Sequence, residues 1–167
     1  MGSKTPNDRA TGSANRSGRR RPPSPAKLQQ WVELAIAKHK TEAELTIRLV
    51  NETEISQLNN TYRGKDKSTN VLSFPADLPE FIELPLLGDL VICSSIVAQE
   101  AHEQNKVSEH HWAHMVIHGT LHLLGYDHVE EHDAVIMEAL EIELLASLNI
   151  ANPYLDTAYI NNTATNL

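Results

Sequence analysis

Three histidines at the end of an expected helix have the spacing of a metal site. They stand in the segment His118-Gly-Thr-Leu-His-Leu-Leu-Gly-Tyr-Asp-His128. Residues four apart on a helix lie one turn apart on nearly the same face, so His118 and His122 project side by side. Gly125 favours the left-handed backbone that ends a helix, after which the chain can return His128 to the same ion. Three protein ligands and an open fourth position describe a catalytic zinc site, so we predict one zinc ion per chain.

The sequence leaves open which carboxylate accepts the imidazole N–H groups and what role His114 has. Metal-bound imidazoles usually donate their second N–H group to a carboxylate, and four nearby residues are candidates for that acceptor: Asp127, Glu130, Glu131 and Asp133. His114, one turn before His118, would flank the site, because four ligands in one row cannot all converge on one ion.

Gly119 bears on the type of hydrolase. In zinc proteases with an H-E-x-x-H helix, the glutamate after the first histidine is the general base. This chain has glycine there. Peptide hydrolysis by the usual route therefore lacks its proton acceptor, which disfavours a protease.

The elements that must position these residues follow from the apolar pattern. Helical periodicity predicts a helix over residues 27–40, and alternation of Leu45, Ile47 and Leu49 predicts a strand over 44–50. Asn51 should cap a helix, and Ser94 or Ser95 should cap another that runs to about residue 104. Further strands are expected at 69–74 and 86–93, and further helices at 108–124 and 133–148. This order predicts a single compact α+β domain, with a small mixed sheet packed against helices, one of which carries His-x-x-x-His.

Composition limits the domains and partners. The chain has 167 residues, 41% of them hydrophobic, which suits one core. Residues 1–27 contain seven Lys or Arg and one Asp, a net +6, which leaves −14 for the rest of a chain whose net charge is −8. A chain that is this acidic beyond residue 27 is not a general nucleic-acid binder, because neutralising phosphates needs a basic surface. We expect a disordered basic tail over 1–27, a hydrolase domain over 28–154 and a flexible tail over 155–167.

Cysteine content and apolar runs bear on location. Cys93 is the only cysteine, which fits a reducing compartment. No apolar run approaches the roughly 18 residues of a membrane span, and the N-terminus lacks the apolar stretch of a secretory signal. We therefore expect a cytoplasmic protein without a membrane partner.

The histidine segment resembles the signature of the YbeY family, single-strand-specific endoribonucleases that act in ribosomal RNA maturation. The stretch Leu58-Asn-Asn-Thr-Tyr-Arg-Gly-Lys-Asp-Lys-Ser-Thr-Asn-Val-Leu-Ser-Phe-Pro75 agrees with it, as does Gly88-Asp89 before an apolar strand. The resemblance covers about residues 45–154. It implies zinc held by the three histidines, processing of the 3′ end of the small-subunit RNA and ribosome quality control. It also implies that Arg63 acts on the RNA phosphate.

The chemistry around Arg63 is compatible with that role. Arg63, Lys65 and Lys67 form the densest basic cluster of the acidic body. A planar guanidinium can bind two phosphoryl oxygens and stabilise their charge in a transition state, so we predict Arg63 as catalytic and the three cations as substrate-binding. Thr69, Asn70 and Ser73 either line a cleft or form a strand edge.

These features together predict a zinc-dependent endoribonuclease whose substrate is single-stranded ribosomal RNA. Its acidity favours partners that present the substrate, such as the small ribosomal subunit or proteins associated with it. Two alternatives remain: a zinc peptidase or amidohydrolase, and a non-catalytic zinc-stabilised factor that docks on the ribosome.

Overall fold

A mixed four-stranded sheet organises the computed structural model, which describes residues 2–4, 21–39, 42–79 and 85–155. In chain order its strands are β1 (Gly2–Lys4), β2 (Glu44–Val50), β3 (Val71–Pro75) and β4 (Leu86–Cys93). The spatial order is β1-β2-β4-β3. Strands β1, β2 and β4 run parallel to one another, and β3 runs antiparallel to β4. β3 is therefore an edge strand.

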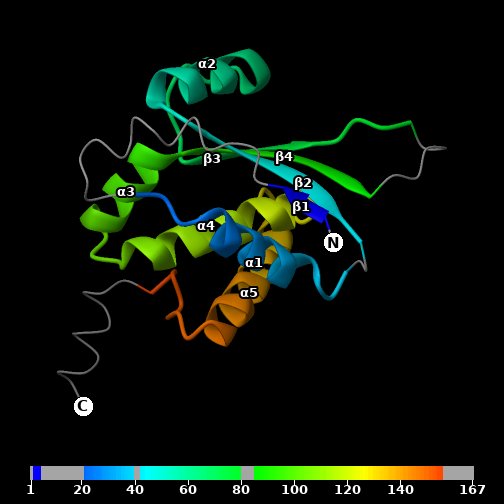
Figure 1. Ribbon diagram of the computed structural model, residues 1–167, viewed down its shortest axis with the longest axis vertical. Coiled ribbons are helices and arrows are strands. Elements are labelled where there is room, and N and C mark those ends of the chain that lie inside the picture. Colours follow the sequence, from blue (N-terminus) through cyan, green and yellow to red (C-terminus); the bar gives the residue numbers. More distant parts are fainter. Residues whose placement is uncertain (1, 5–20, 40–41, 80–84, 156–167) are drawn as a thin grey trace.

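Helices cover both faces of the sheet. In chain order they are α1 (Pro25–Ile36), α2 (Glu52–Arg63), α3 (Ser94–Glu103), α4 (Ser108–Leu123) and α5 (Glu131–Ser147). Figure 1 shows α2 over one face, while α1, α4 and α5 lie on the other. The predicted α+β class is thus confirmed. Within the described part of the chain, no helix is long and apolar enough to cross a membrane.

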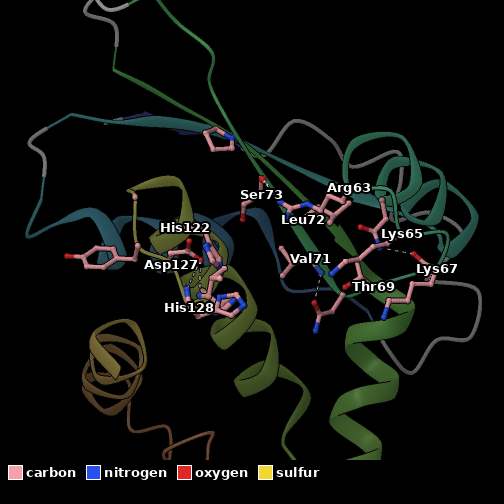
Figure 2. Close-up of a pocket in the computed structure, with 17 residues that line it drawn as sticks. Arg63, Lys65, Lys67, Thr69, Val71, Leu72, Ser73, His122, Asp127 and His128 are labelled. Carbon is pink, nitrogen blue, oxygen red and sulfur yellow. Dashed lines mark hydrogen bonds between the residues drawn. The ribbon is translucent and has the colours of Figure 1, made fainter. Parts of the chain in front are cut away.

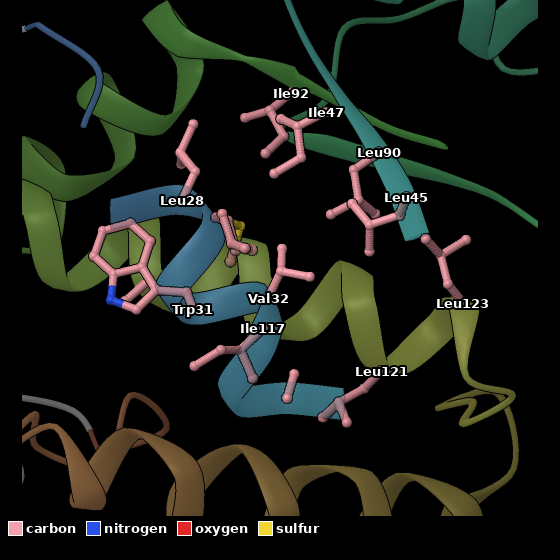
Figure 3. Packing of buried hydrophobic residues seen from close by; sticks show 14 of the residues in the cluster. Leu28, Trp31, Val32, Leu45, Ile47, Leu90, Ile92, Ile117, Leu121 and Leu123 are labelled. Atoms are coloured by element: carbon pink, nitrogen blue, oxygen red, sulfur yellow. The ribbon is translucent and has the colours of Figure 1, made fainter. Parts of the chain in front are cut away.

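The main hydrophobic core lies between the sheet and α4. Leu45 and Ile47 of β2 alternate with exposed or half-buried residues, so the strand presents its apolar side to α1 and α4 (Figure 3). Ile117 and Leu121 of α4 are fully buried against them. Burying one such side chain contributes about 2 kcal/mol. α4 is therefore held on several sides and forms a rigid support for the histidines that it carries.

Two predicted helix starts had different outcomes. Asn51 caps α2 as predicted, since its side chain accepts a hydrogen bond from the Glu54 N–H at 2.8 Å. The predicted serine cap of α3 is wrong. Cys93 occupies the capping position without a side-chain hydrogen bond, and the Ser95 hydroxyl instead donates to Glu52 at 3.0 Å. The chain passes directly from β4 into α3, which leaves the serines inside the helix.

The expected disordered tail over residues 1–27 differs from the structure at its two ends, and most of it lies outside the described residues. Gly2–Lys4 pair in parallel with β2 as strand β1. At the other end, α1 begins at Pro25, two residues before the expected start, because the Ser24 side chain accepts a hydrogen bond from the Lys27 N–H. The expected C-terminal tail also lies outside the described residues, apart from Leu155.

Gly88→Ala is expected to lower the free energy of unfolding by about 3 kcal/mol, because Gly88 combines a positive φ with close packing. Its φ is +142°, and an added Cβ would lie 2.1 Å from the Phe74 carbonyl oxygen of β3. Urea unfolding of both proteins measures the loss. Gly64→Ala is the control, since Gly64 also has a positive φ but open space around it. It should lose only about 1 kcal/mol. Equal losses for the two variants would show that packing against Phe74 has no effect.

Candidate metal centre and its cleft

The end of α4 places two histidines side by side. The ring centroids of His118 and His122 lie 4.7 Å apart, as expected for residues one turn apart on a helix. The helix ends at Leu123, and Gly125 follows with a φ of +107° while its N–H donates to the His122 carbonyl at 3.0 Å. The predicted reversal of the chain at Gly125 is therefore present.

The loop after Gly125 returns the third histidine. The ring centroid of His128 lies 5.4 Å from that of His118 and 4.8 Å from that of His122. One ring nitrogen from each residue lies within 4.8 Å of the other two. The Asp127 carboxylate holds the loop by accepting the N–H groups of His128 and Val129 at 2.6 and 3.2 Å. Asp127 thus binds backbone here rather than an imidazole.

This donor set fits a zinc ion. Zinc accepts imidazole nitrogens, and a site with three of them keeps one position open. An imidazole must be neutral to coordinate a metal. Burial, together with the neighbouring His118 and His128, lowers the pKa of His122 to about 4. His122 therefore offers a neutral ring nitrogen at physiological pH.

The sequence missed the carboxylate that contacts this cluster. Glu141 of α5 is fully buried and accepts a hydrogen bond from Nδ1 of His118. Burial alone would raise the pKa of Glu141, but the hydrogen bonds with His114 and His118 outweigh it and hold the pKa at about 2. Glu141 is therefore an ionised acceptor. Its sequence signal is a glutamate at a core position of a helix, one turn after the buried Met137 and one turn before the buried Leu145.

The basic cluster is positioned by the end of α2. The helix ends at Arg63, and Gly64 adopts the left-handed conformation with φ +69° while its N–H donates to the Asn60 carbonyl at 3.0 Å. The buried Asn59 side chain donates to the Lys67 carbonyl at 3.0 Å and fixes the following turn. One guanidinium nitrogen of Arg63 donates to the Ser73 carbonyl of β3, also at 3.0 Å. The arginine is thus held against the edge of the sheet.

A single cleft of about 740 Å³ joins the two groups. Its lining includes both predicted sets, the metal ligands His118, His122 and His128 and the cations Arg63, Lys65 and Lys67. Figure 2 shows the cations on one side and the labelled histidines on the other, with Val71–Ser73 of β3 between them. The structure therefore brings together all six residues that the sequence assigned to the site.

The polar residues whose place the sequence left open, Thr69, Asn70 and Ser73, also line this cleft. Two of them are engaged in structural contacts. The Asn70 side chain donates to both carboxylate oxygens of Glu100, at 3.1 and 3.2 Å, and accepts the Val71 N–H. The Ser73 hydroxyl donates to the Gly119 carbonyl at 3.2 Å, which ties β3 to the helix that carries His118 and His122.

Gly119 faces the sheet. An added Cβ would lie 2.7 Å from a Leu90 methyl carbon and 3.3 Å from the Ser73 hydroxyl. A glutamate at this position would have to displace those side chains. The close approach of α4 to β3 and β4 thus explains why a glycine follows His118, and the base of an H-E-x-x-H protease is missing.

Comparisons with known proteins cover the whole of this site. A family model described as "Endoribonuclease YbeY" matches residues 15–149, a range that includes Arg63 and the three histidines. The chain is also similar to the solution structure of TM1509 from Thermotoga maritima, with 28% sequence identity and a TM-score of 0.50. That match covers 78% of this chain and 90% of the Thermotoga protein.

Proposed function

This chain belongs to the YbeY family of endoribonucleases, and from that membership we propose that it is a zinc-dependent enzyme that cleaves single-stranded ribosomal RNA. A nuclease is a hydrolase, so the family also supports the predicted class of reaction. One observation carries the proposal furthest. Three imidazoles that could hold a metal ion face an arginine across one cleft, a combination suited to metal-assisted hydrolysis of a phosphodiester.

His118, His122 and His128 would hold the ion, as their ring nitrogens already converge. When bound there, zinc supplies a Lewis acid that polarises a phosphoryl oxygen or acidifies a water molecule. The histidines would fix the position of the ion, since α4 is packed into the core and the Asp127 contacts hold the loop that carries His128.

Arg63 would bind the phosphate to be cleaved. A guanidinium has five N–H donors, and the contact with Ser73 uses only part of this set. The remaining N–H groups can donate to the phosphoryl oxygens and stabilise the negative charge that develops on them. Lys65 and Lys67 extend the positive charge along the cleft and would attract the neighbouring phosphates of a strand.

The charge distribution supports a role for partners. With a net charge of −8, the chain offers RNA a local basic cleft rather than a basic surface. We propose that the small ribosomal subunit, or proteins associated with it, presents the 3′ end of its RNA to this cleft. We also propose that the protein takes part in ribosome quality control and that it lies in the cytoplasm, where ribosomes are assembled.

Cleavage of a labelled small-subunit RNA with a single-stranded 3′ extension tests the proposal. The zinc-loaded protein should cut the extension, and annealing a complementary strand over it should prevent cleavage. A chelator should abolish cleavage, and added zinc should restore it. Zinc-loaded protein that melts on chelation but cuts no RNA would identify the non-catalytic ribosome-binding factor instead.

A further inference from the structure

Glu141 is a charged side chain in the core of the domain. It projects from α5 towards α4 and is 0% exposed, between the buried Met137 and Leu145 of its own helix. Burying an ionised carboxylate is strongly unfavourable unless hydrogen-bond donors surround it. A helix that only had to pack would carry an apolar residue here. The donors around Glu141 therefore indicate what it does.

Three donors from two parts of the chain reach this carboxylate. Nδ1 of His118 donates to one oxygen, and the hydroxyl of Tyr154 donates to the other. Nε2 of His114 lies 3.3 Å from that second oxygen and 3.3 Å from the Tyr154 hydroxyl. The histidines come from α4, whereas Tyr154 comes from the segment that follows α5. Both carboxylate oxygens are thus engaged.

The contact with Nδ1 determines the state of the His118 ring. When Nδ1 carries the proton that Glu141 accepts, the lone pair is left on Nε2. The ring then has one rotation and one tautomer, with its other nitrogen available to the cluster formed with His122 and His128. A carboxylate behind a metal-bound imidazole also raises the basicity of that ligand.

We propose that Glu141 is a positioning residue that orients His118 for metal binding, and that Tyr154 in turn holds Glu141. The inference rests on the proposed function only in that His118 is taken as a metal ligand. It extends the metal centre to α5 and to the segment after it, which ends the described part of the chain. The ion's affinity thus depends on a residue 13 positions beyond Glu141 in sequence.

A different use of the same residues is a second metal site. Ligand atoms of His114, His118 and Glu141 also lie within 4.8 Å of one another. The Tyr154 hydroxyl already donates to Glu141, and His118 would have to lose its Nδ1 proton to coordinate two ions. The geometry therefore favours a hydrogen-bonded carboxylate, and a count of ions per chain separates the two arrangements.

Zinc affinity, measured by competition with a chelating indicator, tests the positioning role in Glu141→Gln and Tyr154→Phe. We expect an affinity loss of about 10- to 100-fold for Glu141→Gln, the range seen when such carboxylates are altered. Tyr154→Phe should show a smaller loss in the same direction. The absorption bands of the cobalt-substituted variants should shift as well, because the ligand field changes when the His118 ring turns.

Two matched controls should keep the affinity and the cobalt spectrum of the starting protein. Glu100→Gln alters a carboxylate that also contacts a histidine of α4, since Nε2 of His111 lies 2.9 Å from Glu100, but His111 is outside the cluster. Tyr62→Phe removes the hydroxyl of a tyrosine that is 65% exposed.

Circular dichroism and melting of the metal-free variants identify those that fold. Folded variants that bind zinc within twofold of the starting protein, with unchanged cobalt spectra, would overturn the proposal. If Glu141→Gln does not fold, Tyr154→Phe decides by the same criterion. Two zinc ions per chain would overturn it in favour of a second site. A starting protein that binds no zinc would instead refute the proposed function.

Discussion

His118→Ala is expected to abolish both zinc binding and RNA cleavage. His118 contacts both other histidines of the cluster and the buried Glu141, so its loss removes one proposed ligand and leaves the buried carboxylate without one of its donors. The loss in zinc affinity should exceed the roughly 100-fold that an altered outer carboxylate causes. Metal analysis after dialysis and cleavage of single-stranded RNA measure the two effects on one preparation.

His132→Ala is the matched control for this variant. His132 is exposed near the start of α5, four residues beyond His128, and lies outside both groups of metal-ligating side chains found among the described residues. It should keep zinc and full activity. A His118→Ala protein that is folded, metal-free and still active would rule out the metal centre as the site of the reaction.

Arg63→Ala should keep its zinc and cleave RNA about 10²- to 10³-fold more slowly, the effect of removing one donor to a developing oxyanion. The arginine is held at the edge of β3 by the Ser73 carbonyl and lies across the cleft from the histidines. Single-turnover rates at saturating RNA measure the chemical step. Arg63→Lys should recover only part of the rate, because an ammonium group cannot bind two oxygens in one plane.

Arg48→Ala controls for a general loss of positive charge. Arg48 is an exposed residue of β2 that pairs with Glu54, and it does not line the cleft. Its replacement should leave the rate within twofold. An Arg63→Ala protein as active as the starting protein would contradict the role assigned to Arg63, while the metal centre would stand.

The parts of this site that the sequence predicted are local in the chain. Helical spacing, a glycine and a short loop suffice to place His118, His122 and His128, because one helix end determines their positions. Strand alternation at Leu45 and Ile47 likewise depends on one strand and one buried face. The α+β class and the clustering of the three histidines therefore followed from periodicity and spacing alone.

The parts that the sequence missed depend on contacts between distant elements. Glu141 meets His118 across a helix pair, 23 residues away in sequence, whereas the predicted acceptors were simply near in sequence. Gly119 stands where an H-E-x-x-H protease has its base, but the physical reason for a glycine there, the contact with Leu90, requires the packing of α4 on the sheet. Arg63 was assigned to the site through a family resemblance, since spacing alone does not place the end of α2 opposite the end of α4.

The rate of RNA cleavage by metal-free protein during stepwise addition of zinc tests the central claim most directly. The three-histidine site predicts a rate that starts at background, rises with each addition and reaches its plateau at about one ion per chain, as a mononuclear catalytic site requires. Full cleavage by protein shown to be free of metal, or a rate that zinc does not change, would contradict a metal-dependent reaction in this cleft.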